Sequence, residues 1–267
     1  MYKILILFLF IIFLSCKKKK PAEIKELNNG WKYETVNKTV ENLFFTFPSE
    51  GFVFEQKDNY VELCAKAIKP NLSLMGLKEY KDSIQIKFYR SKEEMRIKTS
   101  YGSSGYANHF NKTVYLTANE SSAPPIKHEL MHLLSMRTWG VPSRSSDWMN
   151  EGLGTFAENN CDGKSVGEIY RYLMEKNKLI SMNQLSSDFY KQPEMIGYHQ
   201  AGYIVEHLLD FYTIEQFKRL WKDGFENFER IYGVSFSKVK ADLEKIVAVK
   251  YPNAPEIDFE KFSKGCK

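Results

Sequence analysis

The chain has 267 residues, of which 43% are hydrophobic, 27% charged and 15% aromatic, a globular composition that excludes a collagen, a coiled coil or a disordered chain. The formal net charge is +5, but six of the 38 basic and two of the 33 acidic residues lie in residues 1–30, which leaves 32 and 31 in the rest. The folded part is therefore near neutral, and we expect no nucleic-acid partner.

The N-terminal segment predicts export. Lys3 precedes eleven consecutive apolar residues, 4–14, a run that is too short for the ~20 residues of a membrane span but fits a signal peptide. The following Ser15-Cys16 completes a segment that resembles a bacterial lipobox, whose cysteine becomes the lipidated N-terminus. We expect a signal peptide over 1–15 and membrane attachment through a lipid anchor at Cys16. A plain secretory signal with an incidental cysteine is the alternative.

Four lysines follow the predicted anchor and belong to a Lys-rich tether over 16–30. Lysines placed there can lie near anionic lipid headgroups. An acidic surface-export signal is absent at this position, so we expect an exported cell-envelope lipoprotein that faces the periplasm. The sequence does not say which membrane holds it.

Strands and helices share the first half of the remaining chain. Aromatic and β-branched residues predict short strands within 31–54, and alternation of polar and apolar residues predicts a strand over 83–89. Residues 113–117 are expected to form a strand just before a helix. Helical spacing predicts a helix over 58–69, and Ser91 is expected to cap another. The segment 101–106 is rich in glycine and is expected to be a flexible loop.

Helices dominate the second half. They are expected from Pro125 to about 137, near 150–158, and over 165–176, 199–211, 214–222 and 236–249. Strands with helices first and helices alone afterwards predict an α+β fold. We divide it into an α/β lobe over 31–140 and a helical lobe over 141–267.

Three cysteines remain after Cys16, namely Cys64, Cys161 and Cys266. They form no C-x-x-C pair and give no thiolate zinc signal. An odd number in an exported protein permits one disulfide and one free thiol. The pairing is left open because spacing alone does not choose it.

A metal-binding motif lies in the helix predicted after Pro125. The residues His128-Glu129-Leu130-Met131-His132 form an H-E-x-x-H sequence. Residues four apart share a helix face, so both imidazoles can reach one metal ion with Glu129 beside its water. A catalytic zinc usually takes three protein ligands, so a third must lie elsewhere.

The spacing to the next glutamate suggests that third ligand. The metzincin pattern is excluded, because it needs a glycine and a histidine where Ser135 and Thr138 stand. Glu151 follows His132 after eighteen residues, within Asn-Glu-Gly. This arrangement resembles the gluzincin clan of zinc peptidases, specifically the broad peptidase-MA-like family related to the aminopeptidase and thermolysin folds. Glu158 lies two turns farther along and is a poor alternative.

The resemblance implies a fold and a cofactor. The expected fold is gluzincin-like, with an N-terminal mixed sheet, the active-site helix and then a mostly α-helical lobe. One Zn²⁺ per chain would be held by His128, His132 and Glu151. The glycine-rich G-x-M-E-N motif of glutamate-zinc aminopeptidases has no match here, so endopeptidase and exopeptidase action both stay open.

The resemblance also implies a tyrosine, sometimes a histidine, that faces the substrate carbonyl from the helical lobe. Tyr198 matches that position best, with Tyr203 and His199 as alternatives and core packing as the competing role. His109 and His207 are expected to be surface or packing residues.

The implied activity is that of an envelope-anchored zinc metallopeptidase acting on a protein or peptide substrate. Zinc would lower the pKa of its water to ~7, with Glu129 as general base and acid and Tyr198 as oxyanion donor. Thr155 is a candidate to hydrogen-bond a ligand, and the glycines around 102–105 are candidates to admit a peptide at an edge strand. The alternative is a non-catalytic envelope binding lipoprotein on a peptidase-like scaffold. The oligomeric state is left open.

Overall fold

A computed structural model describes residues 34–266 of the chain. The predicted signal peptide over 1–15, the anchor at Cys16 and the tether to residue 30 lie outside the described residues. Residues 34 onward form one structural unit. Across the described part of the chain, no helix is both long and apolar enough to span a membrane.

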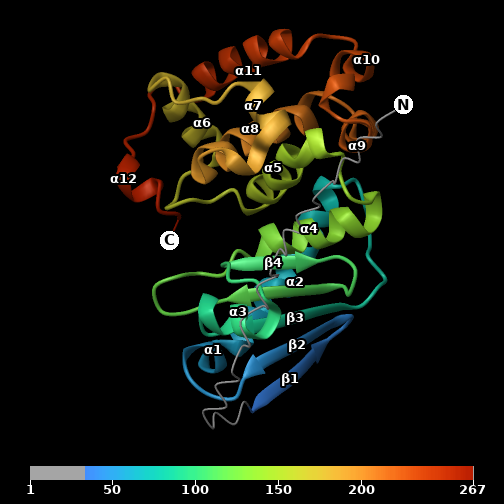
Figure 1. Ribbon diagram of the computed structural model, residues 1–267, viewed down its shortest axis with the longest axis vertical. Coiled ribbons are helices and arrows are strands. Elements are labelled where there is room, and N and C mark those ends of the chain that lie inside the picture. Colours follow the sequence, from blue (N-terminus) through green and yellow to red (C-terminus); the bar gives the residue numbers. More distant parts are fainter. Residues whose placement is uncertain (1–33, 267) are drawn as a thin grey trace, which may run out of the picture. The chain divides into compact units, whose positions relative to one another are not determined.

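A mixed five-stranded sheet occupies the N-terminal half (Figure 1). Its order is β1 (Thr35–Val40), β2 (Leu43–Pro48), β3 (Ile84–Tyr89), β5 (Thr113–Thr117) and β4 (Gly105–Asn108). The central strands β2, β3 and β5 run parallel, and β1 and β4 pair antiparallel at the two edges. Sheet first and helices afterwards confirm the α+β expectation.

The connections within this half depart from the sequence prediction at three places. The strand region expected to reach residue 54 ends earlier, because Gly51 turns the chain with φ 80° and α1 (Phe52–Glu55) follows. Helix α2 (Lys57–Leu74) continues through Pro70 and keeps Leu72 buried. The segment expected to be a flexible loop instead pairs with β5 from Gly105 onward, as strand β4. The predicted cap is confirmed, since Ser91 accepts a hydrogen bond at the start of α3 (Lys92–Thr99).

The second half is helical, as predicted. Its elements are α4 (Ile126–Trp139), α5 (Asp147–Glu158), α6 (Val166–Glu175), α7 (Met182–Asp188), α8 (Glu194–Phe211), α9 (Ile214–Asp223), α10 (Phe228–Tyr232), α11 (Phe236–Lys250) and α12 (Phe259–Phe262), with short 3-10 turns η1 (Arg144–Ser146), η2 (Phe189–Lys191) and η3 (Phe225–Asn227). Helix α8 begins five residues before the predicted 199, with Pro193 at its N-cap and the acidic Glu194 in its first turn, where a negative charge is favourable.

Helix α4 lies between the sheet and the other helices (Figure 1). It contacts β4 and β5 on one side and α2 and α5 on others. Most of its residues are accordingly buried, including Leu130, Leu133 and Leu134. A helix that is packed in this way against the sheet and two other helices is a rigid platform for a site.

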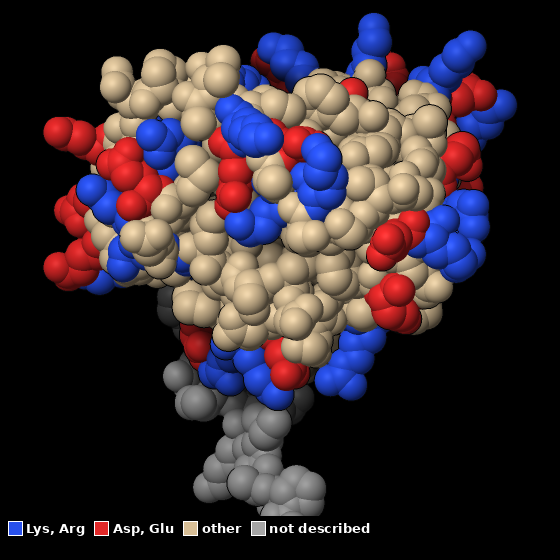
Figure 2. All heavy atoms as spheres, turned by 90° about the horizontal axis from the view of Figure 1, so that it is seen from above, with Lys and Arg blue, Asp and Glu red and all other residues tan. Residues whose placement is uncertain are grey.

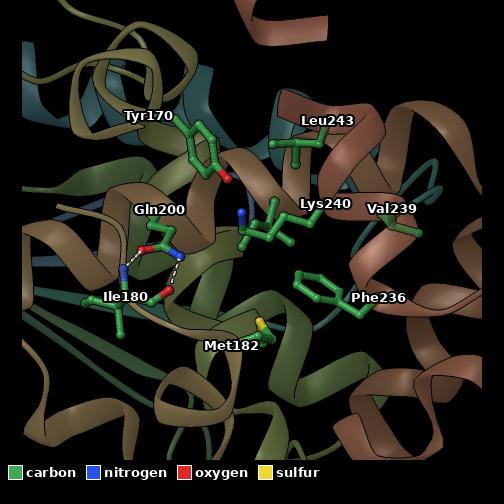
Figure 3. Close-up of a pocket in the computed structure, with 9 residues that line it drawn as sticks. Tyr170, Ile180, Met182, Gln200, Phe236, Val239, Lys240 and Leu243 are labelled. Atoms are coloured by element: carbon green, nitrogen blue, oxygen red, sulfur yellow. Dashed lines mark hydrogen bonds between the residues drawn. The ribbon is translucent and has the colours of Figure 1, made fainter. Parts of the chain in front are cut away.

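Helix α8 is tied to the chain that precedes α7. Gln200 accepts a hydrogen bond from the backbone nitrogen of Ile180 and donates one to its carbonyl oxygen, each at 2.7 Å (Figure 3). Figure 3 also shows Tyr170 and the α11 side chains Lys240 and Leu243 around the same small pocket. These contacts fix the position of α8, the helix that carries Tyr198.

The structure resolves the open cysteine pairing. Cys161 and Cys266 form a disulfide, and Cys64 is a free, buried thiol. The disulfide joins a small second core, made of Cys161, Ile169, Tyr172, Leu173 and Phe262, to the C-terminal segment after α12.

Charges of both signs are interspersed on the face of the molecule that Figure 2 shows. Figure 2 views the molecule from the side of α11, and there Lys and Arg side chains lie among Asp and Glu side chains. On α11 itself, Lys238 pairs with Asp242 and Lys240 pairs with Glu244. Such pairs on a helix surface support solubility and contribute little to stability.

Candidate metal centre

Two imidazoles interrupt the apolar surface of α4: His132 is buried and His128 is mostly buried. The helix starts after Pro125 and ends at Gly140, whose φ of 85° closes it. His128 and His132 lie one turn apart, and their Nε2 atoms are 2.9 Å from each other. Burying two polar rings side by side is costly unless they share a partner, so this pair indicates a ligand site.

Helix α5 brings Glu151 to the same point. Its carboxylate Oε2 lies 3.3 Å from His128 Nε2 and 3.3 Å from His132 Nε2. Gly152 permits this approach, because a Cβ there would lie 2.7 Å from the backbone oxygen of Ala201 on α8. The glycine after the glutamate therefore lets α5 lie close against α8 with Glu151 turned toward α4.

The three ligand atoms match a metal centre. Tetrahedral ligands at about 2.0–2.1 Å from a zinc ion stand about 3.3 Å apart, close to the separations observed here. Two imidazole nitrogens and one carboxylate oxygen are also a donor set that zinc uses in catalytic sites. The group formed by His128, His132 and Glu151 is thus able to hold a metal ion.

Two neighbouring side chains orient these candidate ligands. His132 Nδ1 lies 3.1 Å from Asn150 Oδ1, which can only accept, so Nδ1 donates and Nε2 of the neutral ring carries its lone pair toward the centre. The hydroxyl of Tyr190 donates to Glu151 Oε1 at 3.0 Å. Because Tyr190 occupies one carboxylate oxygen, the other is the one presented to the imidazoles.

The sequence of this region identifies its family. Residues 83–238, more than half of the chain, match the sequence model of the peptidase MA superfamily. The chain belongs to this superfamily. The matched region includes β3, the H-E-x-x-H helix, Glu151, Tyr190 and Tyr198. Membership identifies a peptidase-like hydrolase scaffold, and members of this superfamily usually depend on zinc.

Solved structures and curated proteins add little detail. One similar structure is an aminopeptidase N family protein from Idiomarina loihiensis, which is 12% identical with a TM-score of 0.42. The alignment covers 87% of this chain and 46% of that chain, so this chain spans about half the length of its structural relative. No curated protein matches the sequence.

Electrostatics couple the charged groups of this peptidase MA superfamily site. Burial alone would raise the pKa of Glu151, but His132 and His128 outweigh it and hold that pKa well below its usual range. Burial would lower the pKa of His132, yet Glu151 raises it to about 9. His132 and Glu151 therefore each favour the charged form of the other, and a metal ion would compete with a proton for the same atoms.

Glu129 is buried beside the ligands under the edge strand. Burial raises its pKa, although both imidazoles act against that shift. Gly105 of β4 lies against this side chain, since a Cβ on Gly105 would be 2.4 Å from Glu129 Cγ and 2.5 Å from Oε1. The glycine of the edge strand thus leaves room for the carboxylate, a role different from the flexibility expected from sequence.

The structure separates the three candidate oxyanion donors. The Tyr198 ring stacks on His128 with centroids 6.1 Å apart, and burial and then the Glu151 charge raise its pKa, so its hydroxyl stays protonated. Tyr203 packs on Tyr170 instead. His199 packs on Phe262, where burial lowers its pKa to about 4. Of the three, Tyr198 is the one placed against the ligand cluster.

Sequence reasoning missed Tyr190 and assigned Thr155 a different contact. Tyr190 lies in the 3-10 turn η2, whose three residues carry no periodic pattern. The Thr155 hydroxyl donates to the backbone carbonyl of Glu151 at 2.7 Å, not to its carboxylate. An aromatic residue shortly before the helix of Tyr198 is the only sequence signal that Tyr190 offers.

The remaining candidates have other contacts. Glu158 accepts hydrogen bonds from the backbone nitrogens of Lys127 and His128 at 3.1 and 3.4 Å, so it binds the first turn of α4. His109 contacts Phe110, and His207 is buried against Phe211. Glu158 therefore supports the helix that carries the ligands.

Proposed function

We propose that this chain is a zinc metallopeptidase that hydrolyses peptide bonds in protein or peptide substrates. The observation that carries the proposal is the convergence of three zinc-type ligand atoms within 4.8 Å of one another, with Glu129 next to them in sequence and buried beside them. Membership of the peptidase MA superfamily supports the same class of reaction.

His128, His132 and Glu151 would hold the zinc ion. Zinc bound by such a set polarises a carbonyl group and makes water a nucleophile near neutral pH. Asn150 fixes the tautomer of His132, and Tyr190 fixes which oxygen of Glu151 faces the centre. Both are positioning residues, because each acts through a ligand.

Glu129 is the general base and then the general acid in this proposal. Its raised pKa favours accepting a proton at the carboxylate and later passing it to the leaving amine. The buried position under Gly105 excludes water from one side of the carboxylate. Tyr198, kept protonated by its surroundings, donates a hydrogen bond from its hydroxyl to the developing oxyanion.

The proposed location follows from the N-terminal sequence. The apolar run 4–14 and Cys16 favour an exported lipoprotein anchored in the cell envelope and facing the periplasm. The Cys161–Cys266 disulfide supports an oxidising compartment of this kind. The substrates would then be envelope or secreted polypeptides.

The test is Glu129→Gln beside the wild type. We expect this variant to keep stoichiometric zinc by elemental analysis and to lose cleavage of a peptide library by 10²-fold or more, on the order of general-base effects. The surface variant Glu175→Gln is the matched control and should keep both properties. His128→Ala and Glu151→Ala should lose zinc.

Three outcomes would contradict the proposal. Unchanged cleavage by Glu129→Gln would exclude Glu129 as the general base. Zinc that stays bound to Glu151→Ala would mean that another residue is the third ligand. A zinc-loaded wild type that cleaves no peptide would favour a non-catalytic binding lipoprotein.

A further inference from the structure

A second group of metal-type ligands lies around the disulfide and shares no residue with the proposed peptidase site. Cys161, His199 and Cys266 offer two sulfurs and one imidazole nitrogen, all within 4.8 Å of one another. His199 Nε2 is 3.8 Å from Cys266 Sγ. Nothing in the proposed peptide hydrolysis uses this cluster.

The histidine of this cluster is held with a lone pair toward the sulfurs. His199 Nδ1 lies 2.8 Å from the carbonyl oxygen of Met195, which can only accept, so Nδ1 carries the proton. Nε2 of the neutral ring is then unprotonated and faces Cys266. The ring is 6% exposed and packs on Phe262, so its direction is fixed by the surrounding core.

The two cysteines differ in a way that suits a reversible link. Cys161 is buried, whereas Cys266 is exposed and follows Gly265, which has φ 115°. An exposed disulfide is open to attack by a thiol, and exposed disulfides are the more readily reduced ones. The glycine lets the Cys266 backbone adjust while Cys161 and His199 stay in place.

We propose that reduction of the Cys161–Cys266 disulfide creates a second metal site, of the Cys₂His type, for zinc or a similar thiophilic divalent ion. A dithiol reductant breaks the S–S bond, supplies two electrons and two protons, and leaves as a disulfide. The metal ion then displaces the two thiol protons and is bound by two thiolates and His199 Nε2. Three protein ligands leave the fourth position for water or another donor.

The metal would replace the covalent link as the tie between the C-terminal segment and the body of the protein. In the oxidised form, Cys266 holds the segment after α12 against Cys161. In the reduced form without metal, that segment is joined through noncovalent contacts, namely the small second core around Phe262 and the ion pair between Lys261 and Asp162. Metal binding restores a bond to Cys161 and adds one to His199.

Cobalt(II) distinguishes this site from the peptidase centre, because thiolate ligands give an intense charge-transfer absorption in the near ultraviolet that nitrogen and oxygen ligands do not. The test uses the full-length chain carrying His128→Ala and Glu151→Ala, so that the proposed catalytic ligands are removed. We expect no such absorption in the oxidised protein. The reductant is a phosphine, which does not bind metal through sulfur. After reduction, we expect the absorption to increase with added cobalt and to saturate at one equivalent per chain.

Three variants in the same background assign the ligands. Cys266→Ser should abolish the absorption. His199→Asn can keep the hydrogen bond to the Met195 carbonyl but has no counterpart of Nε2, so it should weaken cobalt binding at least tenfold. Cys64→Ser removes the free buried thiol and should change nothing. Circular dichroism before and after reduction establishes that each variant stays folded.

Each alternative outcome overturns the proposal. Reduced, folded protein without the absorption has no such site. Undiminished cobalt binding by His199→Asn would exclude His199 as a ligand. Loss of the absorption in Cys64→Ser would show that the Cys64 thiol, and not the Cys161–Cys266 pair, gives rise to it. None of these results bears on cleavage by the wild type, so this proposal and the peptidase proposal can fail independently.

Discussion

Replacing Gly105 by alanine tests the placement of Glu129 directly. The added Cβ would lie 2.4 Å from Glu129 Cγ and 2.7 Å from Cδ, whereas non-bonded carbon atoms rest at about 3.5–4.0 Å. Gly105 sits in a β-strand, where alanine is tolerated, so the clash with the glutamate is the main consequence. The carboxylate must withdraw by about 1 Å, which is the scale of misplacement that costs on the order of 10²-fold in rate.

This loss corresponds to about 2.7 kcal/mol in the activation free energy. The clash falls on a side chain that can change rotamer, so the free energy of unfolding should change by only about 1 kcal/mol. The measurements are kcat and KM for a cleaved peptide, zinc content and thermal unfolding. We expect kcat to fall, zinc to stay and the unfolding temperature to change little.

Gly102→Ala is the matched control for this experiment. The three atoms nearest to its Cβ would belong to Arg96 and Lys92, with Arg96 Cβ at 3.1 Å, and none to Glu129, so kcat should be retained. A Gly105→Ala protein with the wild-type kcat would refute the position given to Glu129. A rise in KM with an unchanged kcat would mean that the substitution impairs substrate binding along β4 and not proton transfer by Glu129.

Three further predictions concern the metal centre. Asn150→Ala should weaken zinc binding 10–100-fold in competition with a chromophoric chelator, because His132 loses its orienting partner; unchanged affinity would exclude that role. Tyr190→Phe should also weaken zinc binding, whereas Tyr198→Phe should keep zinc and lower kcat by about 10²–10³-fold. The reverse pattern would mean that Tyr198 positions Glu151 and that Tyr190 stabilises the oxyanion. Chelation should lower the free energy of unfolding by about 2.7 kcal/mol relative to protein held at a hundred times the zinc Kd, and Tm by roughly 5–10 °C; identical melting curves would argue against a bound metal.

The fold was predictable where local patterns agree with tertiary packing. The alternation over 83–89 predicts β3, and the Ser91 cap predicts α3, because each signal depends on neighbouring residues only. Strand β4 is different. Its four residues carry a glycine and become a strand only because β5 lies beside them.

The candidate ligands were predictable from spacing because two short rules apply. Residues four apart share a helix face, which relates His128 to His132, and a family spacing relates them to Glu151. Tyr190 follows neither rule, since its hydroxyl reaches Glu151 from a 3-10 turn 39 positions later in the chain. Contacts of this kind depend on how α5, η2 and α8 pack together, which no local pattern encodes.

The burial of Glu129 favours an enzyme over a binding protein on the same scaffold. The residue is 7% exposed and its carboxyl group has a raised pKa, so keeping that group charged there costs free energy. A site that only binds a metal needs His128, His132 and Glu151 but no further carboxylate beside them. A glutamine at 129 would fill nearly the same volume without the cost of a buried charge. The presence of glutamate at this position therefore favours the proposed role in proton transfer, and Glu129→Gln should yield a protein at least as stable as the wild type.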